Sequence, residues 1–299
     1  MKTKLTSIKC SNSFVQAVAR VVAITLSFVS GSQIATAGMY ENAVIASNPL
    51  AFYQVNEIAG TTMVNSVNPG TYDGTFANVT LNQPGPASEF PYATSASGYT
   101  NGTSSSGLYN LPNGGIPALA SGASFSVEFF VNNDTNQSSV AYSFLFAKGI
   151  TGNYLGIGVG GTGSGGVDNL FLSVGGSDYT TSYQFGSDWN LVALTYDATL
   201  AQANLYVNGV AIISNQSVTP NTADGNFIWG QRYIGPVGPV SAYFSDISIY
   251  DTALSSDIIS EHYNIAMTGV PEPSSALLLG SAGLALVIMR RRWKFLAAR

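Results

Sequence analysis

Apolar residues at every second position between residues 125 and 131 constrain the fold of this chain more than any other feature. An extended strand would place the four odd-numbered residues of this segment on one face. Residues 244–250 alternate in the same way, and residues 191–196 form a nearly continuous apolar run after Trp189. Segments of this length and composition predict β-strands, so we expect a protein built mainly from sheets.

Turn signals separate these segments along the chain. Asn208-Gly209 lies between residues 205–207 and 210–213 and predicts a two-residue hairpin. Residues 154–159 and 170–174 are further expected strands beside glycines. Many short strands with regular turns indicate a β-sandwich or barrel.

One helix is expected, near the end of the β-rich region. Ser255 suits its N-cap, and Asp257 suits its first turn. His262 lies late in this helix, where a side chain that can carry positive charge suits the dipole, and we assign it a structural role. By contrast, residues 85–115 are rich in serine, glycine, asparagine and proline, and we expect them to be mostly loop.

Charge separates the two ends of the chain from its middle. Of the 11 Lys and Arg residues, only Lys148 and Arg232 lie within residues 38–268, whereas 15 of the 16 Asp and Glu residues do, which gives a net charge of −13. This acidity argues against nucleic acid or an anionic membrane surface as a partner. The single cysteine, Cys10, precedes this region, so we expect no disulfide there. The length suits one sandwich domain.

The N-terminal segment, residues 1–37, has the three parts of a signal peptide. Lys2, Lys4 and Lys9 supply positive charge, and residues 21–29 form an apolar core. Residues 35–37 read Ala-Thr-Ala, which is an A-x-A cleavage site, so the mature chain is expected to start after residue 37. The alternative is an uncleaved N-terminal anchor helix.

The C-terminal segment, residues 269–299, carries a turn, an apolar run and a basic cluster in that order. Its parts are Val270, Pro271, Glu272 and Pro273, then residues 274–289, then Arg290, Arg291 and Arg292. A helix over residues 274–289 would be about 24 Å long, which is short for the ~30 Å core of a bilayer. The basic cluster would stay on the cytoplasmic side.

This tail resembles the PEP-CTERM sorting signal of Gram-negative bacteria. The resemblance implies that a membrane protease-transpeptidase, exosortase, recognises the tail at the inner membrane and that the protein is then released to the cell surface or matrix. The alternative is an ordinary C-terminal anchor that is retained.

Six segments of the middle region resemble, in order, the LamG-like, concanavalin A-like domains of bacteria. They are residues 51–57 (AFYQVNE), 65–75 (NSVNPGTYDGT), 124–131 (SFSVEFFV), 189–197 (WNLVALTYD), 205–209 (LYVNG) and 246–264 (DISIYDTALSSDIISEHYN). The resemblance implies an all-β fold, a jelly-roll β-sandwich over residues 38–268 whose first and last strands are neighbours. The chain departs from the family pattern at Tyr53 and Phe130, where tryptophan is usual, at Asn65, where aspartate is usual, and at Asn190, where histidine is usual.

The resemblance also implies a structural calcium ion beside the first and last strands. Glu57 at the end of the first strand and Asp246 in the last would then lie together, with Asp73 and Asn101 in loops that approach them. Calcium is held by six to eight oxygens of carboxylates, amides and carbonyls. The alternative is that these carboxylates accept hydrogen bonds from turn amides.

Candidate sugar-binding residues are aromatic side chains that could stack on sugar rings. Glu128 and Phe130 lie on the strand face opposite to the apolar one, and they would form the floor of a glycan groove if that face is open. If a helix covers that face, they are packing residues. Tyr179, Tyr183 and Trp229 lie in polar, turn-rich contexts and are further candidates.

Several catalytic chemistries are disfavoured by the sequence. Residues 158–163 match G-x-G-x-x-G, but a strand rather than a helix follows, so we expect a hairpin and no dinucleotide site. One histidine and no cysteine in the mature region are too few ligands for zinc. Laminarinase-type enzymes share the expected fold, yet no glutamate here has an aspartate two positions later, and Glu128 stands alone as an expected solvent-facing residue.

The sequence therefore predicts an exported protein of the surface, matrix or biofilm with one LamG-like domain that binds polysaccharide or protein without catalysis. A glycan-cleaving enzyme and a coat protein without ligand are the alternatives, because the fold alone does not determine function.

Overall fold

The computed structural model describes most of residues 38–270. The described residues are 38–102, 107–110, 116, 119, 122–133, 142–150, 153–160, 169–175, 177–220, 227–232 and 238–270. The expected signal peptide and all of the expected sorting tail beyond Val270 lie outside these residues, as does the second half of the glycine run.

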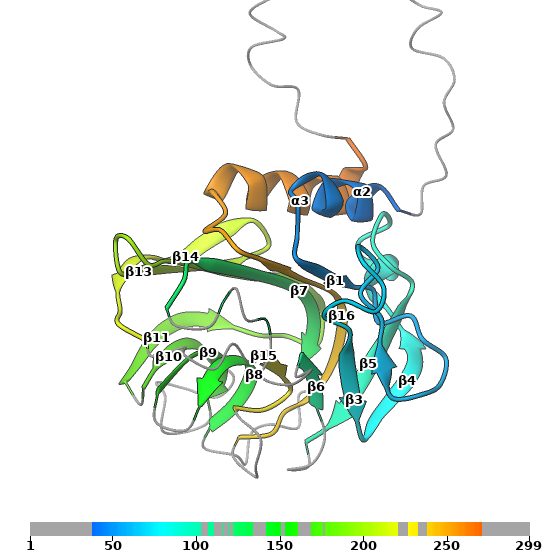
Figure 1. The fold of residues 1–299 in the computed structure, drawn as a ribbon, viewed down its shortest axis with the longest axis horizontal. Coiled ribbons are helices and arrows are strands. Elements are labelled where there is room, and N and C mark those ends of the chain that lie inside the picture. Colours follow the sequence, from blue (N-terminus) through cyan, green and yellow to red (C-terminus); the bar gives the residue numbers. More distant parts are fainter. Residues whose placement is uncertain are drawn as a thin grey trace, which may run out of the picture. The chain divides into compact units, whose positions relative to one another are not determined.

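The described chain forms two antiparallel sheets of eight strands each. Figure 1 shows the two sheets as separate layers. The first sheet has the order β14-β13-β12-β7-β16-β5-β4, with β1 also pairing with β16. Its strands are β1 (Ala51–Tyr53), β4 (Val79–Pro84), β5 (Ala96–Asn101), β7 (Phe125–Asn133), β12 (Trp189–Asp197), β13 (Gln202–Val207), β14 (Val210–Ser217) and β16 (Ser241–Tyr250). The expected jelly-roll β-sandwich is confirmed.

The second sheet has the order β11-β10-β9-β8-β15-β6-β3-β2. Its strands are β2 (Thr62–Met63), β3 (Gly74–Ala77), β6 (Gly107–Asn110), β8 (Tyr142–Ile150), β9 (Asn153–Gly160), β10 (Asn169–Val174), β11 (Ser177–Gln184) and β15 (Phe227–Trp229). Alternate residues of facing strands fill the space between the sheets: Val127 and Phe129 of β7 share one buried apolar cluster with Leu155 and Ile157 of β9. The apolar residues that alternate in the sequence are thus the ones that face the core between the sheets.

Two local predictions about the first sheet are confirmed. The first and last strands are neighbours, because β1 pairs with β16. The Asn208-Gly209 turn joins β13 to β14, and both residues have positive φ (51° and 76°), as the tight hairpin turn requires.

The alternation predicted for residues 244–250 is interrupted by a β-bulge. The register of β16 against β7 shifts between Ser245 and Ser248, and Asp246 lies inside the bulge with a φ of 48°. Phe244, on one side of the bulge, and Ile247, on the other, therefore face the same core although three positions separate them.

Two helices cover the outer face of the first sheet (Figure 1). They are α2 (Met39–Ala46) and α3 (Ser256–Thr268). The Ser255 hydroxyl caps α3 by accepting a hydrogen bond from Ile258 N at 3.4 Å, which confirms the predicted helix start. Helix α2 was not predicted, because its weakly amphipathic sequence, MYENAVIA, follows directly on the expected cleavage site.

Residues 85–115 contain more regular structure than the sequence predicted. Strands β5 and β6 lie in this stretch, after the short 3₁₀ helix η1 (Pro86–Ser88). Gly98 suggests a loop in the sequence, yet it lies within β5. Only glycine fits at this position, because a Cβ there would lie 2.9 Å from Val79 Cγ1 and 3.1 Å from Val55 Cγ1. Glycine therefore marks a close approach in a strand rather than a loop.

The segment around Tyr92 joins the two ends of the domain. Tyr40 N, in the first turn of α2, donates to Tyr92 O at 3.4 Å, and Tyr92 N donates to Ala266 O of α3 at 3.3 Å. Gly269, with a φ of 66°, ends α3 against the Tyr92 ring. Neither helix in the described part of the chain is both long and apolar enough to cross a membrane.

Candidate functional site

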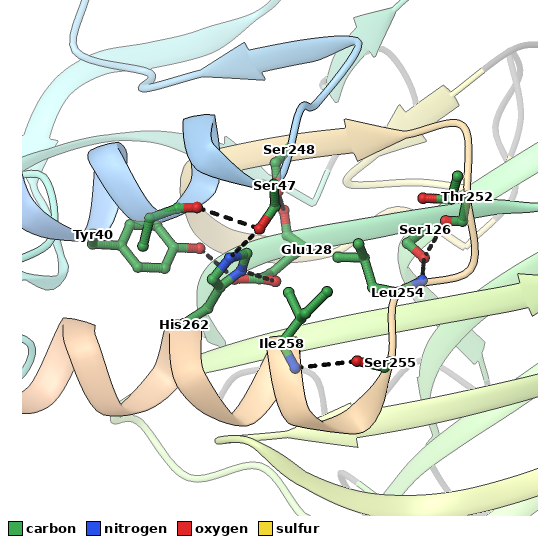
Figure 2. Close-up of polar contacts among 11 residues, drawn as sticks. Tyr40, Ser47, Ser126, Glu128, Ser248, Thr252, Leu254, Ser255, Ile258 and His262 are labelled. Carbon is green, nitrogen blue, oxygen red and sulfur yellow. Dashed lines mark hydrogen bonds and ion pairs between the residues drawn. The ribbon is translucent and has the colours of Figure 1, made fainter. Parts of the chain in front are cut away.

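A buried polar network lies between the first sheet and the two helices, and Figure 2 shows its side chains. The Glu128 carboxylate of β7 accepts a hydrogen bond from the Tyr40 hydroxyl at 2.6 Å and pairs with His262 Nδ1 at 3.0 Å. The other ring nitrogen, His262 Nε2, lies 3.0 Å from Ser47 Oγ at the end of α2. Glu128 and His262 are 0% and 2% exposed. One strand and both helices are thus tied together through one carboxylate.

Charge and burial set the protonation of this network. Burial alone lowers the pKa of His262, but the negative charge of Glu128 and the hydrogen bond to it raise that pKa above its ordinary value. Burial, followed by the charge of Glu128, raises the pKa of Tyr40, so the tyrosine stays protonated and its hydroxyl donates a hydrogen bond to the carboxylate. The network therefore holds a neutral phenol and favours a protonated imidazole beside a carboxylate.

The order Ser47–His262–Glu128 resembles a nucleophile, a base and an orienting acid, but the surroundings are those of a structural clamp. Ser47 N and Asn48 N both donate to carbonyls of α2, so neither is available to stabilise an oxyanion. We therefore assign the network to stability. His262 keeps the structural role predicted for it, although its partner is Glu128 and not the helix dipole.

The expected glycan groove at Glu128 and Phe130 is corrected by the structure. Phe130 is 0% exposed and packs edge-on against Tyr40 at 5.1 Å between ring centroids and against Phe90 at 4.7 Å. This face of β7 lies beneath the helices, so the packing alternative holds and Glu128 does not face solvent. The sequence shows no signal for the covering helix α2.

Asp246 is also buried, in the bulge of β16. Its carboxylate accepts hydrogen bonds from both the backbone N–H and the hydroxyl of Thr94. Burial raises the pKa of Asp246 to about 7, although the bonds from Thr94 lower it. Asp246 therefore fastens the loop that precedes β5 to the last strand.

The other predicted calcium ligands have separate partners. Glu57 accepts a hydrogen bond from Val64 N at 2.8 Å, and Asp73 accepts from Asn65 N at 2.9 Å and from Gly70 N at 3.1 Å. Asn101 ends β5 opposite Ser241. Within the described ranges, no three acidic or histidine side chains gather where they could share an ion. These carboxylates serve turn amides, as the sequence alternative stated, and a calcium site stays a prediction.

Two of the predicted aromatic ligands are held inside the domain. Trp229 of β15 is 0% exposed and lies in the core between the sheets, where its ring stacks on Phe227. Tyr183 of β11 is half-buried and donates its hydroxyl to Asn190 Oδ1 at 2.8 Å. The expected exposure of Trp229 is wrong, because its short strand is central in the second sheet and not in a turn.

Tyr179 lines a cavity at the edge of the sandwich. The cavity has a volume of about 190 Å³ and lies where the turn between β10 and β11 meets the end of β14 and the residues after it. It is lined by Val174, Gly175, Ser177, Tyr179, Ser217, Val218, Thr219 and Pro220. None of these residues is charged. The hydroxyls of Ser177, Ser217 and Thr219 belong to exposed residues and make no hydrogen bond within the described chain.

A second aromatic cluster, on the outer face of the second sheet, was not predicted. Phe144, Tyr154 and Phe171 pack together there, apart from the main core. The Arg232 guanidinium lies 5.2 Å from the Tyr154 ring centroid and 5.6 Å from that of Phe144. Gly158 permits this packing, since a Cβ there would lie 2.0 Å from Phe171 Cζ. The first glycine of the G-x-G-x-x-G match thus makes room for a phenylalanine ring.

Comparison with known families accounts for this architecture. A sequence model of the family Laminin_G_3, described as the concanavalin A-like lectin/glucanases superfamily, matches residues 100–260, more than half of the chain. The chain belongs to this superfamily. No curated protein matches the sequence significantly.

Solved structures of other proteins share the fold. Trypanosoma rangeli sialidase in complex with the inhibitor DANA aligns with a TM-score of 0.52 and 15% identity over 74% of this chain and 33% of the sialidase. Domain 4 of AbnA, an extracellular GH43 arabinanase from Geobacillus stearothermophilus solved with arabinotriose, aligns with a TM-score of 0.51 and 19% identity over 72% and 98%. The alignment of this chain thus covers about a third of the length of the sialidase and nearly all of the arabinanase domain. At these identities the likeness concerns the fold.

Proposed function

We propose that this protein is exported to the surface or extracellular matrix of a Gram-negative bacterium and binds polysaccharide there without cleaving it. Membership of the lectin/glucanase superfamily is the observation that carries the proposal. The similar domain of the Geobacillus arabinanase was solved with an arabinose oligosaccharide, which supports a sugar as the ligand class. The acidity of residues 38–268 favours a neutral polysaccharide over an anionic one.

The two carboxyl groups that are buried in the described chain, Glu128 and Asp246, are not placed as a glycosidase acid and base. Retaining glycosidases place two carboxyl groups about 5–5.5 Å apart beside the sugar, and inverting enzymes place them about 6.5–9.5 Å apart. Glu128 is bonded to Tyr40 and His262 beneath the helices, and Asp246 is bonded to Thr94. Neither carboxylate is free to meet a substrate.

A glycan array probed with the purified protein tests this function, with and without calcium. We expect binding to neutral polysaccharides and no release of reducing sugar from the bound ones. Release of reducing ends would establish the laminarinase-type alternative. Binding to no glycan would overturn the proposal and favour a protein ligand or a coat without ligand. Calcium-dependent binding, or a higher melting temperature in calcium than in chelator, would establish the predicted ion.

The sorting signal forms the second part of the proposal. Exosortase at the inner membrane would process the tail, whose sorting motif begins at Val270, directly after Gly269 ends α3. Replacing Pro271, Glu272 and Pro273 with alanines should leave the protein unprocessed in the inner membrane of its host. Fractionation and mass measurement detect this outcome. Release of a shortened protein from the variant would contradict the sorting model.

A further inference from the structure

The cavity at Tyr179 has the chemistry of a sugar-binding pocket. Its lining combines one half-buried aromatic ring with the hydroxyls of Ser177, Ser217 and Thr219. Hydroxyls both donate and accept hydrogen bonds, as sugar hydroxyls do, and a tyrosine ring offers an apolar face with a polar edge. No charged residue lines the cavity, so it offers no counter-charge to an anionic or a cationic ligand.

The position of the cavity leaves its polar groups available. Tyr179 lies on β11, one edge of the second sheet, and Ser217 ends β14, one edge of the first sheet. Val218, which is buried and bonded through its N–H to Ala201 O at 2.9 Å, fixes the backbone between Ser217 and Thr219. Gly175 N is bonded to Tyr154 O at 2.9 Å, which fixes the opposite wall. The walls are thus preformed, as ligand sites usually are.

The volume sets the length of sugar that fits. Pockets for drug-sized ligands are usually about 300–1,000 Å³, and this cavity is smaller at about 190 Å³. It has room for one sugar ring and none for neighbouring rings on both sides. We propose that this cavity binds a single neutral sugar residue at a chain end or side branch, with Tyr179 as the stacking surface and Ser217 and Thr219 as hydrogen-bonding groups. This inference rests on the proposed polysaccharide binding and names its site and ligand class.

Variants of the two tyrosines of β11 test the site. Tyr179 and Tyr183 are both half-buried and face the same side of the strand. Tyr183, however, donates its hydroxyl hydrogen bond to Asn190 and lies outside the cavity. With neutral methyl glycopyranosides and array glycans as probes, Tyr179→Ala should raise the Kd at least tenfold, and Tyr183→Ala should leave it unchanged. Melting curves of both variants establish that they fold.

Thr219→Val provides a second test that leaves the core untouched, because Thr219 is exposed. It should weaken binding several-fold while the melting temperature stays the same. Glycans in which the recognised sugar is terminal should bind, and the same glycans extended by one residue should not. If the protein binds glycans but both Tyr179→Ala and Thr219→Val bind normally, the cavity is not the site and the proposed function stands. Equal binding of extended glycans would overturn end recognition, and failure of the unmodified protein to bind any glycan would remove the proposed function itself.

Discussion

His262 Nδ1 lies 3.0 Å from Glu128 Oε2, although 134 residues separate the two in the chain. The pair joins the helix before the C-terminal segment to the central strand of the first sheet, and Tyr40 adds the helix that follows the N-terminal segment. A buried carboxylate with two such partners is costly to disturb, because removing one member of a buried pair leaves the other charge uncompensated.

The first prediction concerns this pair. Glu128→Ala should lower the free energy of unfolding by about 3–5 kcal/mol, measured by denaturant titration. Glu261→Gln removes an exposed carboxylate beside His262 and should change stability by about 0.5 kcal/mol or less. Equal effects of the two substitutions would contradict the assignment of a buried clamp.

A second prediction concerns pH. The folded pKa of His262 lies above its unfolded value of about 6.5, so the stabilisation from its protonation is fully present below about pH 6.5. It is lost as the pH rises through the folded pKa. Unfolding free energies measured from pH 6 to pH 9 should therefore fall in the unmodified protein. Glu128→Gln should flatten that fall, because the charge that raises the pKa of His262 is gone.

Asp246 provides the third prediction, in a different pH range. Its pKa is raised from 3.8 to about 7 in the folded protein, so the folded state keeps a proton that the unfolded state loses. Stability should thus fall between about pH 4 and pH 7, by roughly 4 kcal/mol in total, and then level off.

Asp246→Asn isolates this contribution. Asparagine tolerates the positive φ of the bulge and can still accept a bond from Thr94 N. The variant should be more stable than the unmodified protein above pH 7. Its stability should not show the fall between about pH 4 and pH 7 that the Asp246 carboxyl group causes. A variant that is less stable at pH 8 would show that the carboxylate is needed in its charged form.

The fourth prediction concerns Phe130. Because its ring is fully buried between Tyr40 and Phe90, Phe130→Ala should cost about 3–5 kcal/mol of stability. Near-normal melting together with a loss of glycan binding would instead place the ring in an open groove.

The fifth prediction concerns the close approach at Gly158. Gly158→Ala should destabilise the protein by about 1–3 kcal/mol, because the new methyl group collides with Phe171. Gly186→Ala is the matched control, since a Cβ there meets nothing nearer than 3.9 Å. Combining Gly158→Ala with Phe171→Leu should recover part of the loss; no recovery would mean that the cost arises elsewhere.

Periodicity and turn chemistry predicted the fold because both act locally. The alternation around Phe129 and the Asn208-Gly209 turn depend on few neighbours, and both are as expected. The bulge at Asp246 was not predictable, since it depends on how the last strand meets Thr94. The burial of Glu128 depends on α2, whose sequence carries little helical pattern, so the side chain opposite the core appeared exposed.

The candidate site was predicted only in part, for a related reason. Of the five candidate ligand-binding residues, Tyr179 alone lines the cavity. Ser177 at the start of β11, Ser217 at the end of β14 and Thr219 just after it complete the lining, but polar residues at strand ends are common and give no signal of their own. The edges of the two sheets are distant in sequence, and the contacts between them decide which polar residues share a cavity.

The meeting of both ends at Tyr92 makes this domain suitable as a cassette. Tyr40 and Ala266 are bonded to the same residue, so the chain enters and leaves the fold at one place. Grafting residues 38–269 into a surface loop of another protein would separate the two sides of that loop very little, and domain insertion succeeds best at such sites. A direct link between the two ends, with new termini at Asn208-Gly209, would likewise give a circular permutant. This permutant would keep every strand pairing of the first sheet and lose only the tight turn that joins β13 to β14.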